Sequence, residues 1–241
     1  MRLNKFLAAM GIFSRREADR AIEAGRVSIN GEVAALGETV NDDDLVSVDG
    51  KYIATGSDVS KVKPIIIAFN KPEGIVCTTS DIDGALNVVD YIGMKERIYP
   101  VGRLDKDSCG LLLLTNQGEL TNSLLKASNY HEKEYIVKVN KEIEEDFIVR
   151  MQNGIYLHEL GVKTRKCKVK KLNKNTFSIT LTQGLNRQIR RMCAALGMKV
   201  QKLNRVRIVN IKLEELAVGE YRNLRDDEVK KLYKELGLKR D

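Results

Sequence analysis

The chain has 241 residues, and its 43% hydrophobic content can bury the core of one large domain or two smaller ones. Its formal net charge of +8 favours an anionic partner, with nucleic acid ahead of lipid, and we expect a cytoplasmic protein with neither a signal peptide nor a membrane span. Four cysteines without a CxxC pair and only two histidines argue against a metal site, a disulfide framework and histidine-based acid–base chemistry.

The first fifty residues predict a compact module of two helices and a few short strands. Apolar residues at helical spacing predict a short helix that ends at Gly11, and Ser14-Arg15-Arg16-Glu17 is a capping box that opens a second helix. Residues 27–29 and 43–48 alternate as strands, and Asn30-Gly31 is a strong hairpin turn. We therefore expect a small α/β domain over residues 1–51.

The basic residues of this module gather in its helical part. Arg15, Arg16 and Arg20 would share a basic face, although helical spacing alone fits ordinary surface charge equally well. The sequence from Arg2 to Gly31, with S-R-R-E-A-D and G-R-V-x-I-N-G, resembles the S4 RNA-binding domain. This resemblance implies that the three arginines contact RNA.

The run TGSDVSKVK, at residues 55–63, is polar and lacks apolar periodicity, so we expect a linker over residues 52–63 and a second domain over residues 64–241. The β-branched run at residues 64–69 predicts a buried strand. The turn Asn70-Lys71-Pro72-Glu73-Gly74 is then expected to expose Lys71. A lone exposed lysine is more typical of a protein surface than of a site.

Residues 99–120, YPVGRLDKDSCGLLLLTNQGEL, join a charged loop to an apolar strand. Arg103, Asp105, Lys106 and Asp107 precede the run 111–114, which is short enough to be a buried strand, and a helix is expected from Glu119. A strand that fixes such a loop suits a reactive carboxylate. On composition alone, a solvated turn is the more common outcome.

Two strings carry a family resemblance. G-R-L-D-K-D-S-x-G-L-L-x-L-T-N-x-G-x-L resembles the catalytic motif of the RsuA-like ribosomal-RNA pseudouridine synthases, and N-K-P-E-G-I-V-C-T-T resembles their opening motif. The resemblance implies an α+β fold, in which a mostly antiparallel mixed sheet flanked by helices follows the S4-like module. It also implies that Asp105 is the nucleophile, and we assign Arg103 and Lys71 to RNA contacts.

Residues 133–139, KEYIVKV, alternate as a strand with Tyr135 on its apolar face. A tyrosine in this position is most often a packing residue. In the K-x-Y-x-V motif of the same family, however, the tyrosine stacks on the target base and is proposed to take part in proton transfer. H-E-K-E-Y resembles the branch that acts on large-subunit rRNA.

The segment from Leu160 to Leu213 is strongly basic, because it holds fifteen Lys and Arg residues and no Asp or Glu. Interspersed signs are usual on protein surfaces, so this run predicts a face that follows RNA phosphates. Paired strands are expected at residues 167–172 and 176–182, and Asn186 is expected to cap the helix that follows. The last helix, from Asp226 onward, is expected only to pack.

G-x-N-R-Q-I-R-R-M, at residues 184–192, matches the other strong motif of the family. The resemblance implies that Arg190 pairs with Asp105, and a nearby guanidinium favours the ionised form that a nucleophile needs. Arg187 and Arg191 are then assigned to the RNA backbone.

The sequence thus predicts isomerisation of a flipped-out uridine in large-subunit (23S) rRNA to pseudouridine, without a metal or other cofactor, by a monomer. It leaves open whether tRNA is a second substrate. It also leaves open whether Asp105 attacks C1′, adds to C6 or deprotonates the ribose. Two alternatives are an RNA-binding assembly factor without catalysis and a hydrolase that uses an aspartate nucleophile.

Overall fold

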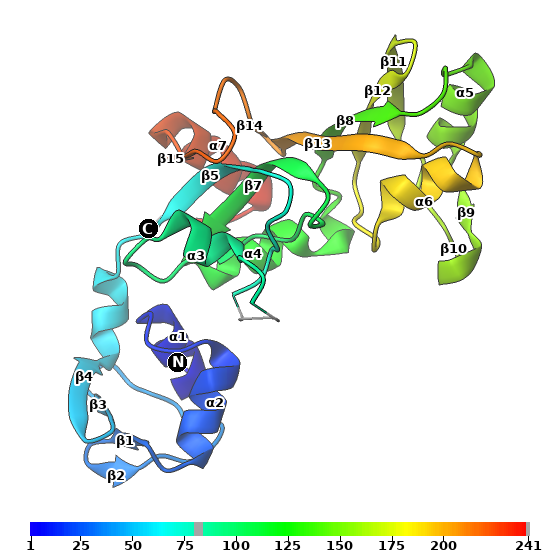
Figure 1. Cartoon of the computed structure of the whole chain (residues 1–241). Helices are drawn as coiled ribbons and strands as arrows, with labels where there is room; N and C mark the ends of the chain where they lie inside the picture. Colours follow the sequence, from blue (N-terminus) through cyan, green and yellow to red (C-terminus); the bar gives the residue numbers. More distant parts are fainter. Residues whose placement is uncertain (80–83, 240–241) are drawn as a thin grey trace. The chain divides into compact units, whose positions relative to one another are not determined.

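The computed structural model describes residues 1–79 and 84–239 and divides the chain into two compact units (Figure 1). Unit 1 comprises Met1–Ile65 with two short later segments, Met94–Ile98 and Asn116–Gly118. Unit 2 comprises Ile66–Gly93, Tyr99–Thr115 and Glu119–Asp241. None of the helices in the described ranges is long and apolar enough to span a membrane.

Unit 1 contains the predicted helices α1 (Leu3–Ala9) and α2 (Arg15–Glu23) and a four-stranded sheet in the order β2-β1-β3-β4. The strands are β1 (Val27–Ile29), β2 (Glu32–Val33), β3 (Leu45–Val48) and β4 (Lys51–Thr55). The predicted capping box is present, since Glu17 accepts from the Ser14 backbone at 2.6 Å and Ser14 Oγ accepts from the Glu17 backbone at 3.2 Å.

The segment expected to be a linker is instead structured. Its first residues lie in β4, which pairs with β3, and the next form the 3-10 helix η1 (Gly56–Lys61). Asp58 accepts hydrogen bonds from the backbone and the hydroxyl of Thr55, and Val59 packs against the core of unit 1. Its polar residues cap a short helix, so their lack of apolar periodicity did not indicate a linker.

Unit 2 is built on a nine-stranded sheet, which is mixed and mostly antiparallel, as predicted. The main path runs β11-β12-β8-β13-β7-β5-β15, with β6 beside β7 and β14 beside β13. Within this described sheet, β13 and β7 form the one parallel pair. The strands are β5 (Ile66–Lys71), β6 (Tyr99–Pro100), β7 (Cys109–Thr115), β8 (Lys133–Val139), β11 (Lys168–Asn173), β12 (Thr176–Leu181), β13 (Val200–Ile208), β14 (Ile211–Lys212) and β15 (Tyr221–Asn223).

Two hydrophobic cores divide unit 2 into two halves. One core packs β8, β12 and β13 against α5 (Glu145–Asn153) and α6 (Gln188–Ala195). The other packs β5 and β7 against α4 (Gly118–Leu125) and α7 (Asp226–Leu236). The remaining elements are α3 (Val88–Ile92), the paired strands β9 (Tyr156–Leu157) and β10 (Val162–Lys163), and the 3-10 turns η2 (Ala127–Asn129) and η3 (His158–Leu160).

The two halves meet where β7 pairs with β13, at Cys109 with Asn204 and at Gly110 with Arg205. Gly110 has a φ of +101°, and a Cβ there would lie 2.2 Å from Asn204 Oδ1 and 2.4 Å from the Arg205 carbonyl oxygen. Only glycine fits such a close approach of two backbones. The loop before β7 is therefore fixed at the junction of the two halves.

Candidate active site

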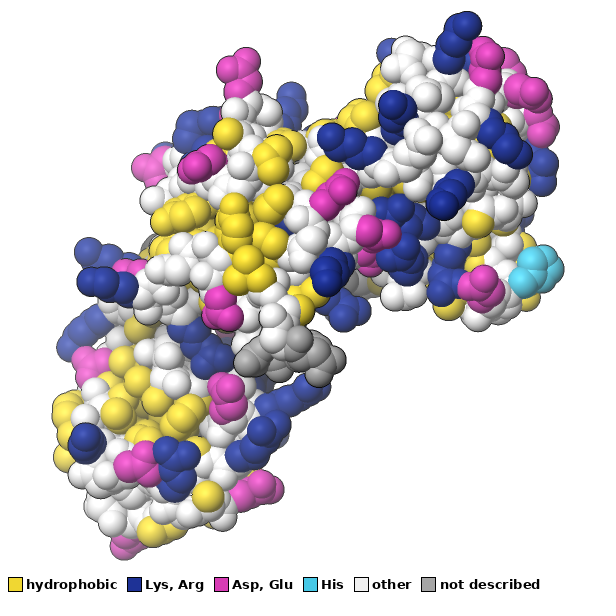
Figure 2. Space-filling model, viewed as in Figure 1, with side chains coloured by type: hydrophobic (Ala, Val, Ile, Leu, Met, Phe, Trp, Pro, Cys, Tyr) yellow, Lys and Arg dark blue, Asp and Glu magenta, His cyan; other side chains and the backbone are white. Residues whose placement is uncertain are grey.

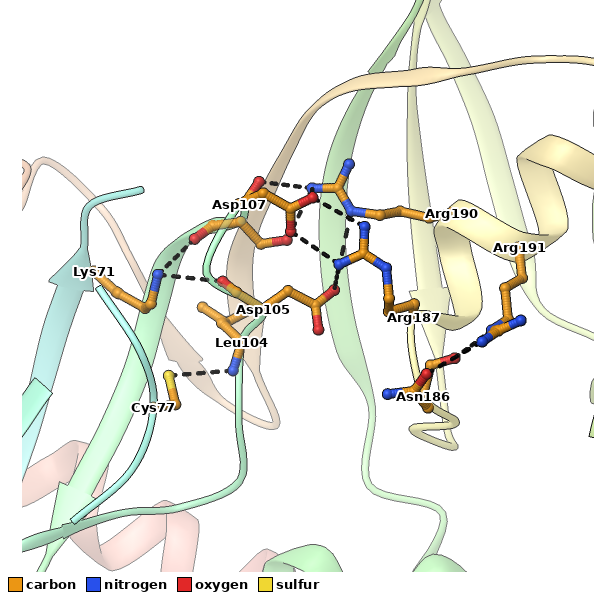
Figure 3. Close-up of polar contacts among 10 residues, drawn as sticks. Lys71, Cys77, Leu104, Asp105, Asp107, Asn186, Arg187, Arg190 and Arg191 are labelled. Atoms are coloured by element: carbon orange, nitrogen blue, oxygen red, sulfur yellow. Dashed lines mark hydrogen bonds and ion pairs between the residues drawn. The ribbon is translucent and has the colours of Figure 1, made fainter. Parts of the chain in front are cut away.

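The loop that carries Asp105 is held by Lys71, the last residue of β5 (Figure 3). Lys71 Nζ donates to the carbonyl oxygens of Pro72 at 2.8 Å, Ser108 at 2.8 Å and Asp105 at 3.3 Å. The expectation that Lys71 is exposed is wrong, because its side chain is fully buried. In this position Lys71 cannot contact an RNA phosphate, and it braces the loop instead.

Further contacts hold the same loop from the segment after β5. The Gly74 backbone donates to the Lys106 carbonyl at 2.8 Å, and the Leu104 backbone donates to Cys77 Sγ at 3.4 Å. Burial lowers the pKa of the Lys71 amine and raises the pKa of the Cys77 thiol. The opening motif thus supports the charged loop through its backbone contacts.

Helix α6 brings two arginines to the loop from the other half of unit 2. The predicted cap is wrong: the helix begins at Gln188, and Arg187 occupies the N-cap position with a left-handed φ of 50°. Asn186 instead accepts from Arg191, through its carbonyl at 3.1 Å and its side-chain oxygen at 3.4 Å. Buried Ile189 and Met192 anchor the helix and leave Arg187 and Arg190 facing the loop.

The structure brings Asp105 close to Arg190, but Arg187 lies nearer. Arg190 Nε is 3.9 Å and Arg187 Nη1 is 3.4 Å from Asp105 Oδ2. Arg190 also donates through Nη2 to the Asp107 carbonyl at 2.6 Å and to Ser108 Oγ at 3.1 Å. Arg190 therefore fixes the backbone beside Asp105, while Arg187, which we had assigned to RNA phosphates, is paired within the protein.

Asp107 is a part of the site that the sequence reasoning missed. Arg187 binds its two carboxylate oxygens at 3.1 and 3.0 Å, and this hydrogen bonding holds the pKa of Asp107 below its usual range. Spacing along the chain does not reveal this pair, because Arg187 reaches Asp107 from the N-cap position of α6 in a left-handed conformation. Arg187 and Arg190 together contact the two acids of the loop.

A pocket of about 120 Å³ opens beside Asp105. Its lining includes Arg103, Asp105, Tyr135, Leu181, Leu185 and Leu203. Tyr135 lies on β8 in register with Arg205 of β13, and its ring also packs against the core of that half. The predicted carboxylate and aromatic ring therefore line the same small pocket, which has both polar and apolar walls.

Acids from outside the basic segment of residues 160–213 balance part of its charge. Arg207 pairs with Glu132 and Glu134 at 2.9 Å, and Arg191 pairs with Glu159. Figure 2 shows the resulting mixture of signs over the half that carries β8, β11 and α6. Lys168 and Lys171 are exposed but contact Glu132 and the Ile143 carbonyl. Seven further exposed lysines can follow phosphates: Lys163, Lys166, Lys170, Lys174, Lys199, Lys202 and Lys212.

The other RNA-contact residues predicted from the sequence occupy accessible positions. Arg103 is exposed at the pocket rim, and Arg15, Arg16 and Arg20 are exposed on α2 of unit 1. Across residues 1–79 and 84–239, no cluster of three or more His, Cys, Asp or Glu is placed to hold a metal ion. The four cysteines are free thiols.

Two family models match the chain. The model for RNA pseudouridylate synthases matches residues 65–195, and the S4 domain model matches residues 1–51. The chain is 50% identical to the dual-specificity RNA pseudouridine synthase RluF of Escherichia coli K12, over 97% of this chain and 79% of that protein. It is 36% identical to the ribosomal large subunit pseudouridine synthase B of Bacillus subtilis, over 96% of this chain and 95% of that protein.

A solved structure agrees with these sequence relatives. The crystal structure of a pseudouridylate synthase superposes with a TM-score of 0.70 at 30% sequence identity. The match covers 96% of this chain and 99% of that one. It therefore includes both the S4-like part and the sheet that carries the pocket.

Proposed function

Because the chain belongs to the RNA pseudouridine synthase family and carries an S4 domain, we propose that it converts a uridine of large-subunit (23S) rRNA to pseudouridine. The relative synthase B supports this choice of RNA, since it is named for the large ribosomal subunit. The observation that carries the proposal is the pocket in which the Asp105 carboxylate lies beside Tyr135 and two arginines.

Asp105 is the nucleophile in this proposal, and Tyr135 is the base-stacking residue. Arg187 and Arg190 hold the loop around Asp105, so that the carboxylate is in place before RNA arrives. The apolar walls at Leu181, Leu185 and Leu203, with the face of Tyr135, suit a detached uracil that must not escape or meet water.

The reaction breaks the bond between C1′ and N1 of the uridine and forms one between C1′ and C5. The hydrogen on C5 is lost as a proton and N1 gains one, so the mass of the RNA is unchanged. Asp105 starts this sequence by attack on C1′, addition to C6 or deprotonation of the ribose. In each case the base must first leave the stack, which costs a few kcal/mol and least in loops or bulges.

The test is release of tritium from rRNA labelled at uridine C5. We expect Asp105→Ala and Asp105→Asn to lower the rate by at least about a thousandfold, because the first bond change then has no nucleophile. Their affinity for RNA should stay within a few-fold of wild type. The matched control is Asp146→Asn, which changes an exposed acid of α5.

The two alternatives give different results in this assay. A binding protein releases no tritium even as wild type, and a hydrolase yields free uracil or a cleaved strand rather than an RNA of unchanged mass. Mapping pseudouridine in cells that lack the protein, then restoring wild type or Asp105→Ala, identifies the uridine. A site restored by Asp105→Ala contradicts the proposed nucleophile.

We extend the same mapping to tRNA, because the Escherichia coli relative is named as a dual-specificity enzyme. We also propose that the protein acts as a monomer in the cytoplasm. Light scattering with and without RNA measures the oligomeric state.

A further inference from the structure

An exposed aromatic ring with a guanidinium against one face lies in the loop before β8. Tyr130 is 59% exposed, and Cζ of Arg165 lies 4.2 Å from the centroid of its ring. The guanidinium lies over the ring, and more than half of the surface of Tyr130 remains exposed. A cation–π pair at an exposed site adds little stability, so folding alone does not account for this arrangement.

The backbone of Tyr130 is strained. It adopts a left-handed conformation, with φ of 54° and ψ of 30°, which bulky residues rarely take and which glycine or asparagine would take at lower cost. Strain of this kind concentrates at binding sites, where it places a side chain in a particular direction. In Tyr130 the strained backbone carries a ring that remains exposed to solvent.

The guanidinium behind the ring is itself fixed. Arg165 Nη1 donates to the carbonyl oxygens of Ala127 and Thr182, each at 3.1 Å. The Arg165 backbone donates to Gln183 Oε1 at 2.9 Å. Tyr130 and Arg165 therefore form a preorganised flat surface, which loses little freedom when a second flat group stacks on it.

This surface is a neighbour of the active-site pocket. Gln183, which accepts the hydrogen bond from the Arg165 backbone, also lines the pocket beside Asp105 and Tyr135. Lys163 and Lys166, on either side of Arg165 in the chain, are exposed. A partner that offers a flat π system next to negative charge fits this surface, and an unpaired nucleotide has both.

We propose that Tyr130, with Arg165 against its ring, is a stacking platform for an unpaired nucleobase that flanks the target uridine. This inference rests on the proposed function. Through this platform the enzyme recognises an unpaired nucleotide next to the target uridine. The target uridine then lies in a loop or beside a bulge rather than in a continuous duplex.

The test compares RNA binding and turnover of Tyr130→Ala and Tyr130→Phe, with Tyr221→Ala as the matched control. Tyr221 is also an exposed tyrosine, but it lies on β15 at the opposite edge of the sheet from β11 and β12. The probes are the rRNA fragment around the mapped uridine, with 2-aminopurine at each unpaired position in turn, and a short oligoadenylate.

We expect Tyr130→Ala to weaken binding of both probes by about 5- to 100-fold, the range for loss of one stacked base. KM should rise with kcat nearly unchanged, and quenching of 2-aminopurine at one flanking position should disappear. Tyr130→Phe keeps the ring and should behave like wild type, as should Tyr221→Ala.

The proposal is overturned if Tyr130→Ala binds both probes and quenches 2-aminopurine like wild type at an unchanged melting temperature. It is also overturned if Tyr130→Phe is as weak as Tyr130→Ala, because the hydroxyl group would then be the contact. Failure of the proposed function appears separately, as wild-type protein that binds and quenches RNA but releases no tritium from C5.

Discussion

Lys71 ends β5 with its ammonium group among three backbone carbonyl oxygens of the two neighbouring turns. All three hydrogen atoms of the ammonium find an acceptor, which is what allows a lysine to be fully buried without a carboxylate partner. An apolar side chain of similar length would fill the same space and leave the carbonyls of Asp105 and Ser108 without this donor.

Lys71→Met should lower the free energy of unfolding by about 2–4 kcal/mol, because buried acceptors lose their partner. It should also lower kcat, since the Asp105 loop loses its brace. Urea denaturation and tritium release measure the two effects. Lys106→Met is the control, because Lys106 is exposed in the same loop, and its stability should stay within about 0.5 kcal/mol. Equal stability of the two variants would contradict the bracing role.

The lowered pKa of Lys133 predicts a pH dependence of protein stability that a Lys133 variant can reveal. Burial, and to a lesser degree the Arg205 guanidinium, lowers the pKa of Lys133 to about 8 from its usual 10.5. Between these two values the unfolded chain holds a proton that the folded chain has released. The contribution of Lys133 to the free energy of unfolding therefore rises with pH across this window.

The difference in unfolding free energy between wild type and Lys133→Met should accordingly increase in favour of wild type from pH 8 to pH 10.5. Below pH 8 the difference should be constant. Denaturation at a series of pH values measures it, with Lys138→Met, an exposed position on the same strand, as the control. Parallel curves for wild type and Lys133→Met across this window would show that Lys133 titrates normally.

The sequence motifs predicted which individual residues meet, but not all of their partners. Asp105 lines one pocket with Tyr135 and lies 3.9 Å from Arg190, as expected from strings that belong to one family. The bidentate pair of Arg187 with Asp107 depends on how two loops approach each other across the sheet, which spacing along the chain does not encode. The burial of Lys71 depends on the same approach.

At the scale of elements, the pairing of β7 with β13 positions the candidate active site. Asp105 precedes β7 in one half of unit 2, whereas Tyr135 and Arg187 belong to the half that contains β13. The strands can approach because Gly110 presents no side chain to Asn204 and Arg205. Any displacement of this pair of strands changes the distance between the carboxylate and its two arginines.

Gly110→Ala should therefore destabilise the protein by at least about 3 kcal/mol, because the new Cβ has a strained φ and meets backbone atoms that cannot move independently. Thermal unfolding followed by circular dichroism measures the loss. Gly184→Ala is the matched control, since its φ is not left-handed and no atom lies within 4 Å of its Cβ position. A melting temperature for Gly110→Ala equal to that of Gly184→Ala would contradict the close approach.

Elements with strong periodicity or clear caps were predictable, and those defined by local polar contacts were not. Apolar spacing and capping residues predicted α2, β7 and α7. β4 and η1 were missed because their polar residues cap and pair, which resembles a linker in composition. The start of α6 shifted because Arg187 takes a left-handed conformation that sequence preference disfavours.

At the scale of the whole molecule, the net charge of +8 predicted an anionic partner, and the family assignment agrees with it. The distribution of this charge over the protein surface was harder to predict from the sequence. Most arginines of the basic segment are paired with acids that lie outside it in the sequence, so counting charges along the chain overstated the free positive surface. The exposed arginines of α2 remain candidates for phosphate contacts.

Replacement of Arg15, Arg16 and Arg20 by Gln should weaken RNA binding and reduce the slope of log K against log salt by about 2 to 3, because each phosphate contact releases nearly one counterion. Turnover at saturating RNA should be nearly unchanged. Filter binding at several salt concentrations measures the slope. The control replaces Lys230, Lys231 and Lys234, three exposed lysines of α7, by Gln. Equal slopes for the two triple variants would remove the S4 arginines from the interface.

The ion pair between Asp107 and Arg187 joins residues 80 positions apart in the chain. During translation, the loop with Asp105 and Asp107 therefore leaves the ribosome roughly 4 to 16 s before Arg187 does. Until then Asp105 lacks the guanidinium groups of Arg187 and Arg190. The candidate active site is thus completed late in synthesis, after most strands of the sheet in unit 2 have been synthesised.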